Sequence, residues 1–107
     1  MFQKIILWDI YEIHTTKTSI NGVMFRGRIR KFCLKNKRNV LVENAEDITG
    51  IVRFSIPHKE NSSEIEKYLH TLAPDISIKL IREKIPNPIL SKLKVNIESR
   101  YTLSKKL

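Results

Sequence analysis

The stretch Ile20-Asn21-Gly22-Val23-Met24-Phe25-Arg26 joins an alternating apolar segment to a basic segment with helical periodicity. Gly22 can adopt backbone angles that other residues avoid, so successive N–H groups can turn toward one point. A helix that starts near Val23 or Met24 would direct its free N–H groups and its dipole at an anion there. Arg26 would then lie in the first turn and could donate two hydrogen bonds to the same anion. An ordinary strand-to-helix turn with a solvated arginine is the alternative interpretation.

The composition is that of one globular domain. A chain of 107 residues with 41% hydrophobic and 29% charged residues is long enough to bury a core without help from disulfides or a structural metal. Its single cysteine, Cys33, excludes an internal disulfide and a cysteine-based zinc site, and it indicates a reducing compartment. The N-terminus lacks the layout of a signal peptide, and no apolar run is long enough to span a membrane. We therefore expect a monomeric cytoplasmic protein without membrane attachment.

The net charge limits the choice of partners. The chain carries 20 Lys and Arg against 11 Asp and Glu, a formal charge of +9. Such a charge attracts anions at long range, from phosphorylated metabolites to nucleic acid. The charge alone does not distinguish these partners.

Periodicity predicts strands and helices that alternate along the chain. Residues 4–16 read as a strand with a bulge near Ile10 and Tyr11, where two alternating apolar series are out of phase. Residues 23–37 read as a helix with one apolar stripe, which includes Cys33 as a core thiol. Val40 to Val42 and Ile48 to Ile56, the latter including Gly50, read as a hairpin around a turn at 44–47.

The second half of the chain repeats the alternation. Ser63 and Glu66 match a capping box at the start of a second helix, which Pro74 ends. Residues 76–80 alternate as a fourth strand, Pro86 and Pro88 break the chain, and residues 94–101 read as a short final strand. The order β-α-β-β-α-β predicts a single α+β domain over residues 1–107. It is the ferredoxin-like pattern, a four-stranded antiparallel sheet with two helices on one face.

Two short motifs lie at informative positions on this pattern. Residues 21–26 resemble the Q-G-V-x-F-R part of the acylphosphatase signature, which in that family also joins the first strand to the first helix. Residues 40–48 lie where the family has a hairpin of the form G-W-V-x-N-x-x-D-G. Residues 95–101 are a loose counterpart of a final strand that reads roughly F-x-I-x-Y. The chain is therefore similar to acylphosphatases in element order and in two motifs.

The resemblance implies a metal-independent and cofactor-independent hydrolase. Acylphosphatases cleave carboxyl-phosphate mixed anhydrides to a carboxylate and phosphate. Carried over, Arg26 binds the phosphoryl group and Asn44 positions the attacking water. The backbone N–H groups of Asn21, Gly22, Val23, Met24 and Phe25 form the phosphate cradle. These roles suit phosphoryl transfer, which needs charge stabilisation and alignment more than covalent chemistry.

The chain departs from the family pattern in both motifs, and Val40-Leu41 stands where the family has the G-W pair. Thr18 stands where the family usually has glycine, Ser19 where it has arginine, and Met24 where a small residue is common. Ile48 stands in place of the turn glycine. Because a β-branched residue is poor at positive φ, the hairpin turn must differ from the family's.

The remaining alternatives use other features of the chain. The basic residues from Arg26 to Arg38 are compatible with a nucleic-acid-binding module, although the aromatic pattern of RNA-recognition domains is absent. A catalytically inactive domain that binds an anionic partner is a further alternative. His14, His58 and His70 have no metal-ligand spacing, so we expect no metal site, and Trp8 is expected in the core.

Overall fold

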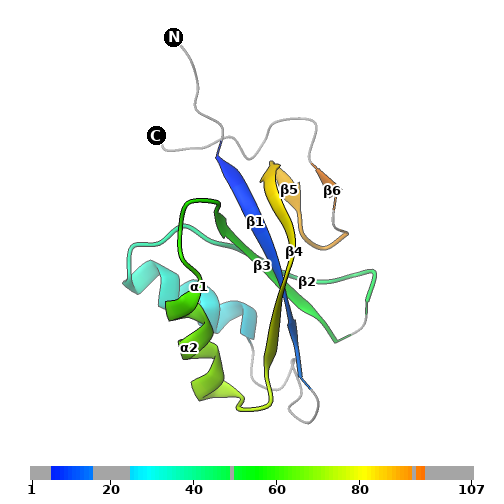
Figure 1. The fold of residues 1–107 in the computed structure, drawn as a ribbon. Helices are drawn as coiled ribbons and strands as arrows, with labels where there is room; N and C mark the ends of the chain where they lie inside the picture. The colour runs from blue at the N-terminus through cyan, green and yellow to red at the C-terminus, as the bar shows by residue number, and fades with distance from the viewer. Residues whose placement is uncertain (1–5, 16–24, 49, 93, 96–107) are drawn as a thin grey trace.

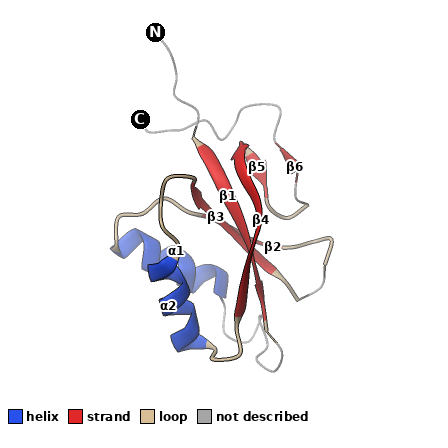
Figure 2. Cartoon of the chain, in the orientation of Figure 1, coloured by secondary structure: helices blue, strands red, loops and turns tan. Residues whose placement is uncertain are grey.

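The structure, a computed structural model, describes residues 6–15, 25–48, 50–92 and 94–95. It is an α+β fold, as predicted (Figures 1 and 2). The elements in chain order are β1 (Leu7–His14), α1 (Phe25–Lys35), β2 (Leu41–Asn44), β3 (Val52–Pro57), α2 (Ser63–Leu72), β4 (Ser77–Pro86), β5 (Pro88–Ile89) and β6 (Lys94–Val95).

The main sheet has four strands in the order β2-β3-β1-β4, and each neighbouring pair is antiparallel. Helix α1 connects β1 to β2, and α2 connects β3 to β4. The two helices contact each other and lie beside the sheet (Figure 1). The short strands β5 and β6 form a separate antiparallel pair. This arrangement is compatible with a ferredoxin-like fold.

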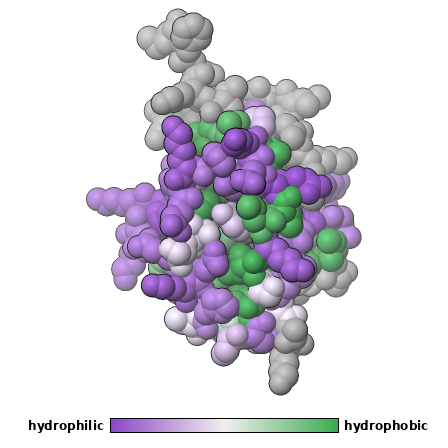
Figure 3. Space-filling model, in the orientation of Figure 1, coloured by the Kyte–Doolittle hydropathy of each residue, from purple (hydrophilic) through white to green (hydrophobic). Residues whose placement is uncertain are grey.

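One apolar core joins both helices to alternate residues of the central strands. Its largest members come from α1, α2 and β3 and are fully buried: Phe25, Ile29, Ile65, Leu69, Phe54 and Ile56. Cys33 belongs to this core, and Trp8 is also buried, as the sequence predicted. The visible surface over the helices is mainly hydrophilic (Figure 3). The amphipathic spacing of both helices therefore explains which of their faces is buried.

The bulge predicted in the first strand lies in β4 instead, since β1 pairs with β3 without a register shift and the extra residues opposite β1 belong to β4. The pairing of β1 with β4 shifts register between Trp8 and Ile10 and again between Ile10 and Tyr11. Tyr11 and Ile13 belong to the core beneath the helices, whereas Glu12 lies on the opposite face. One apolar series of this strand therefore lies on each face of the sheet.

The predicted bounds of the hairpin were wrong. β2 continues to Asn44, and β3 begins at Val52 and not at Ile48. Gly50 lies in the connecting loop with a φ of 80°, where a residue with a side chain would be strained. Ile48 is exposed, and the positive φ falls on Gly50 instead of Ile48.

Three other boundaries also need correction. The residue preceding α2 is Ser62, whose hydroxyl donates to the Glu66 carboxylate, so Ser63 with Glu66 is not the capping pair. β4 extends past residue 80 to Pro86, because its bulge and its edge position tolerate a proline at the end. The predicted final strand is seen at Lys94–Val95, and residues 96–101 lie outside the described residues.

Candidate functional site

The described part of helix α1 begins at Phe25, whereas the predicted start near Val23 or Met24 falls on residues outside the described ranges. Phe25, its first residue, is 1% exposed and anchors this end of the helix in the core. Arg26 follows in the first turn and is exposed to solvent. The predicted cradle residues Asn21, Gly22, Val23 and Met24 lie outside the described residues. Of the predicted phosphate site, the structure thus places Phe25 and Arg26.

Asn44 lies at the same end of the sheet as the C-terminal end of β1. It is the last residue of β2 and is exposed. Asn44 pairs with Val52 of β3, and Val52 pairs with Ile13 near the end of β1. The Ala45 N–H donates to the Ile51 carbonyl at 2.8 Å and closes the hairpin just beyond. The sheet register therefore aligns Asn44 with the start of the β1–α1 connection.

A contact between α1 and β2 orients the helix relative to this end of the sheet. The Arg30 guanidinium donates from Nη2 to the Val42 carbonyl at 3.0 Å. Arg26 precedes Arg30 by about one helical turn, so it lies roughly 6 Å closer to the N-terminal end of α1 along the helix axis. Asn44 is two residues further along β2, roughly 6.6 Å. Because a short loop joins α1 to β2, the two elements run in opposite senses, so both steps lead to the same end of the molecule.

The hairpin loop that follows Asn44 is held by a buried arginine that sequence reasoning missed. Arg53 of β3 is 1% exposed and alternates with Val52 and Phe54, so it lies on the sheet face away from the helices. Its Nη1 and Nη2 donate to the two carboxylate oxygens of Asp47 at 2.7 and 2.9 Å. Asp47 lies in the loop, three residues after Asn44. This two-point contact ties the loop to the sheet.

Arg53 has further partners on the same face, which include the Ser91 carbonyl at 3.4 Å from Nη1. Its Nε donates to Glu12 of β1 at 2.8 Å, and Glu12 is 8% exposed. Its Nη1 also donates to the Leu90 carbonyl at 2.8 Å, just after β5. A single guanidinium thus connects β1, β3, the hairpin loop and the segment after β5. A charged residue within the apolar strand 51–56 is the sequence signal that could have revealed it.

The ion pair changes the proton affinity of both partners. The hydrogen bonds from Arg53 hold the pKa of Asp47 below its ordinary value of 3.8. The same contact with Asp47, supported by Glu12, raises the pKa of Arg53 above its ordinary value. Both groups are therefore charged at neutral pH, and the loop anchor is intact there.

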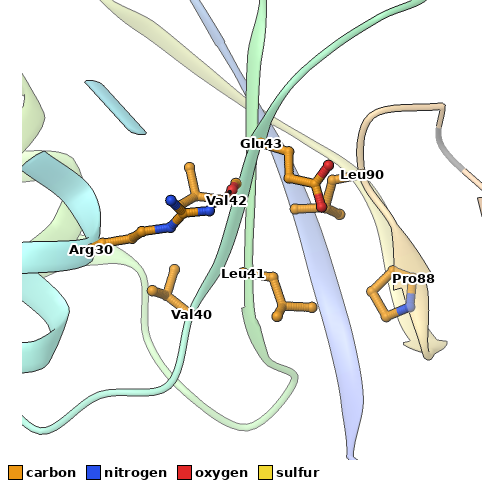
Figure 4. Close-up of a pocket in the computed structure, with 7 residues that line it drawn as sticks. All are labelled: Arg30, Val40, Leu41, Val42, Glu43, Pro88 and Leu90. Atoms are coloured by element: carbon orange, nitrogen blue, oxygen red, sulfur yellow. Dashed lines mark hydrogen bonds between the residues drawn. The ribbon is translucent and has the colours of Figure 1, made fainter. Parts of the chain in front are cut away.

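A cavity of about 260 Å³ lies between α1, the free edge of β2 and β5. Its described lining, drawn in Figure 4, consists of Arg30, Val40, Leu41, Val42, Glu43, Pro88 and Leu90. Arg30 enters from the helix side, while Pro88 and Leu90 form the opposite wall (Figure 4). Since Arg30 already donates to the Val42 carbonyl, its guanidinium also protects the edge of β2. The cavity adjoins the candidate site but does not include Arg26 or Asn44.

Residues that could hold a metal lie elsewhere. In the part of the chain that the structure describes, Asp9, His58 and Glu83 present ligand atoms within 4.8 Å of one another. Asp9 is four residues from Ile13 along β1, so this group is roughly 13 Å from the Asn44 end of the sheet. The group lies outside the candidate phosphate site.

Comparison of the chain with protein-family models, curated proteins and solved structures gives no match. These comparisons neither support nor refute an acylphosphatase assignment. Within the described residues, no helix has the length and apolar character needed to cross a membrane.

Proposed function

We propose that the chain is an acylphosphatase-like hydrolase with the ferredoxin-like fold, its two helices covering one face of the sheet. Its substrates would be small acyl phosphates, and its products a carboxylate and inorganic phosphate. The sheet order β2-β3-β1-β4 and the helical connections β1–α1–β2 and β3–α2–β4 support the fold assignment. The resemblance of residues 21–26 and 40–48 to the family motifs supports the reaction.

The observation that carries the proposal is the register of Asn44. Through Val52 and Ile13, this side chain is level with the end of β1. The chain then runs through the cradle motif to Arg26, which is exposed in the first turn of α1. Arg26 and Asn44, which are 18 positions apart in sequence, are thus directed to the same end of the molecule. The proposed reaction needs this proximity because the phosphoryl group and the attacking water must meet in line.

In the proposed mechanism, the Arg26 guanidinium donates two hydrogen bonds to oxygens of the phosphoryl group and stabilises their charge. Backbone N–H groups of residues 21–25 bind the same group at the start of α1. The Asn44 amide holds a water molecule by accepting and donating hydrogen bonds. The water oxygen bonds to phosphorus, the bond from phosphorus to the acyl oxygen breaks, and its electron pair leaves on the carboxylate. One water proton passes to solvent.

The Arg53 contact supports this mechanism through the position of Asn44. The loop after Asn44 is attached to the sheet by Asp47, and Arg53 is itself fixed by Glu12 and Leu90. A fixed hairpin limits the movement of the water-holding amide. Arg53 is therefore a positioning residue in the proposal.

Hydrolysis of benzoyl phosphate tests the proposal. The wild-type protein should hydrolyse it above the uncatalysed background, and Arg26→Ala should lower kcat/KM by on the order of a hundredfold or more. Arg26→Lys should not restore the rate, because an ammonium group cannot donate in the geometry of the guanidinium fork. Arg28→Ala is the matched control: Arg28 is exposed on the same helix and its loss changes the net charge equally. Equal losses in Arg26→Ala and Arg28→Ala would indicate a general charge effect and contradict the proposal.

A basic domain that binds a polyanion is the second candidate. Exposed cations on α1 favour it, namely Arg26, Arg28, Arg30, Lys31 and Lys35. However, Phe54, the aromatic residue of β3, is fully buried and stacks on Tyr11 with ring centroids 5.0 Å apart. It cannot stack on a base. We expect weak, unspecific binding, and nanomolar sequence-dependent binding at physiological salt would favour this second candidate.

A further inference from the structure

The sheet end opposite the candidate phosphate site carries a cluster that the proposed hydrolysis does not use. It consists of Asp9 of β1, His58 just after β3, and Glu83 of β4. One ligand atom from each residue lies within 4.8 Å of the other two. Ligand atoms about 2.1 Å from a shared zinc ion lie up to roughly 4.2 Å apart, so small side-chain rotations bring all three within bonding distance.

A β-bulge places Glu83 in this cluster. Trp8 pairs with Ile85 and Ile10 pairs with Arg82, so Glu83 and Lys84 together face the single residue Asp9. Lys84 adopts a φ of 57°, and its backbone N–H donates to Asp9 Oδ1 at 3.1 Å. The Asp9 carboxylate thus satisfies an N–H group that the bulge removes from the ladder. The bulge holds Glu83 beside Asp9.

His58 is also fixed in place. Its backbone N–H donates to the Leu7 carbonyl at 2.7 Å, which continues the pairing beyond the end of β3. Its ring Nδ1 lies 2.8 Å from Asp9 Oδ1. The three candidate ligands therefore come from adjacent chain segments whose backbones are held by hydrogen bonds.

The charges at this cluster are unusual for so basic a chain. Asp9 is 5% exposed, and Glu83, which is exposed to solvent, lies next to it. Among the described residues, neither carboxylate forms an ion pair with a lysine or arginine. Besides the Lys84 backbone N–H, Asp9 contacts the His58 imidazole, which carries a charge only when it is protonated. A buried carboxylate beside a second one is unfavourable without a compensating cation.

We infer that Asp9, His58 and Glu83 bind one divalent cation of the zinc class. One imidazole nitrogen and two carboxylate oxygens suit Zn²⁺, whereas Mg²⁺ and Ca²⁺ prefer oxygen ligands alone. The cation joins β1, β4 and the residue after β3, and water completes its coordination. Its role is to stabilise this end of the sheet, since the cluster is remote from Arg26 and Asn44. The inference does not depend on the proposed hydrolysis.

Calorimetric titration of the full chain with Zn²⁺ tests this inference. The wild-type protein should bind one ion, and His58→Gln and Glu83→Gln should each weaken binding at least tenfold. His70→Gln is the matched control, because His70 is exposed on α2 and lies outside the cluster. It should leave the affinity unchanged, and excess Mg²⁺ should not compete with Zn²⁺.

Thermal unfolding provides a second readout on the same variants. Zn²⁺ at a hundred times its dissociation constant should raise the melting temperature of the wild-type protein and of His70→Gln, because a ligand of the native state stabilises it. The shift should be absent in His58→Gln. The inference would be overturned if the His58→Gln variant still bound zinc, or if the His70→Gln variant no longer bound one zinc ion.

Discussion

Replacement of Arg53 by methionine should be among the most destabilising single changes in the described part of the chain. The side chain is 1% exposed and donates to Glu12, Asp47 and the Leu90 carbonyl. Methionine fills similar volume but leaves the nearly buried Glu12 carboxylate without its guanidinium partner, with the His14 imidazole at 3.2 Å as its remaining side-chain contact among the described residues. Breaking a buried ion pair in this way costs about 3–5 kcal/mol. For a domain of about 100 residues, the melting temperature should then fall by roughly 12–20 °C.

The assay is urea and thermal unfolding followed by circular dichroism. Arg53→Lys should recover only part of the loss, since one ammonium group cannot reach three partners in the geometry of the guanidinium. The double variant Arg53→Met with Glu12→Leu should be more stable than Arg53→Met, because no buried charge is left unpaired.

Two results would refute this reasoning. A loss below about 1 kcal/mol in Arg53→Met would place Arg53 among ordinary surface residues. A double variant no more stable than Arg53→Met would show that the loss does not come from an uncompensated Glu12 carboxylate. Either result would also remove the support that Arg53 gives to the position of Asn44.

Three further predictions concern single positions. Gly50→Ala should destabilise the protein by about 1 kcal/mol, because Gly50 has a φ of 80°. Gly27→Ala in α1 should stabilise the protein by up to about 1 kcal/mol, and at both sites there is open space for the added methyl group. Urea unfolding that gave the opposite signs would contradict this prediction. Arg53 lowers the pKa of Asp47, so its ion pair stabilises the fold above pH 4 and is lost as the pH falls through the lowered pKa. Asp47→Asn should therefore lower the urea midpoint more at pH 7 than at pH 2, and an equal loss at both would exclude the ion pair as the cause. Burial raises the pKa of the Cys33 thiol, so it should react with a thiol reagent far more slowly in the native protein than in urea, and equal rates would place it at the surface.

Periodicity predicted the elements whose faces differ clearly in polarity. The stripe containing Phe25, Ile29 and Cys33 predicted α1. The phase change at Ile10 reflects apolar residues on both faces of β1 and not a bulge in that strand, because the bulge lies in β4. The boundaries around Gly50 were wrong because the apolar residues Ile48 and Ile51 continue the strand pattern into the loop. Backbone conformation, which periodicity does not report, ends the strand there.

Buried polar groups could not be predicted from local patterns. Arg53 interrupts an apolar strand, and its partners Glu12 and Leu90 lie 41 and 37 residues away in sequence. Asp9, His58 and Glu83 have no metal-ligand spacing, and the sheet register alone brings them together. By contrast, Arg26 and Asn44 could be proposed from sequence because short motifs mark both positions.

Steady-state kinetics of Asn44→Ala test the central claim most directly. The amide is proposed to hold the attacking water and not the phosphoryl group. With benzoyl phosphate as substrate, kcat should fall by on the order of a hundredfold, while inhibition by inorganic phosphate should be unchanged. A wild-type protein without hydrolysis above background, or an Asn44→Ala variant with the wild-type kcat, would contradict the account.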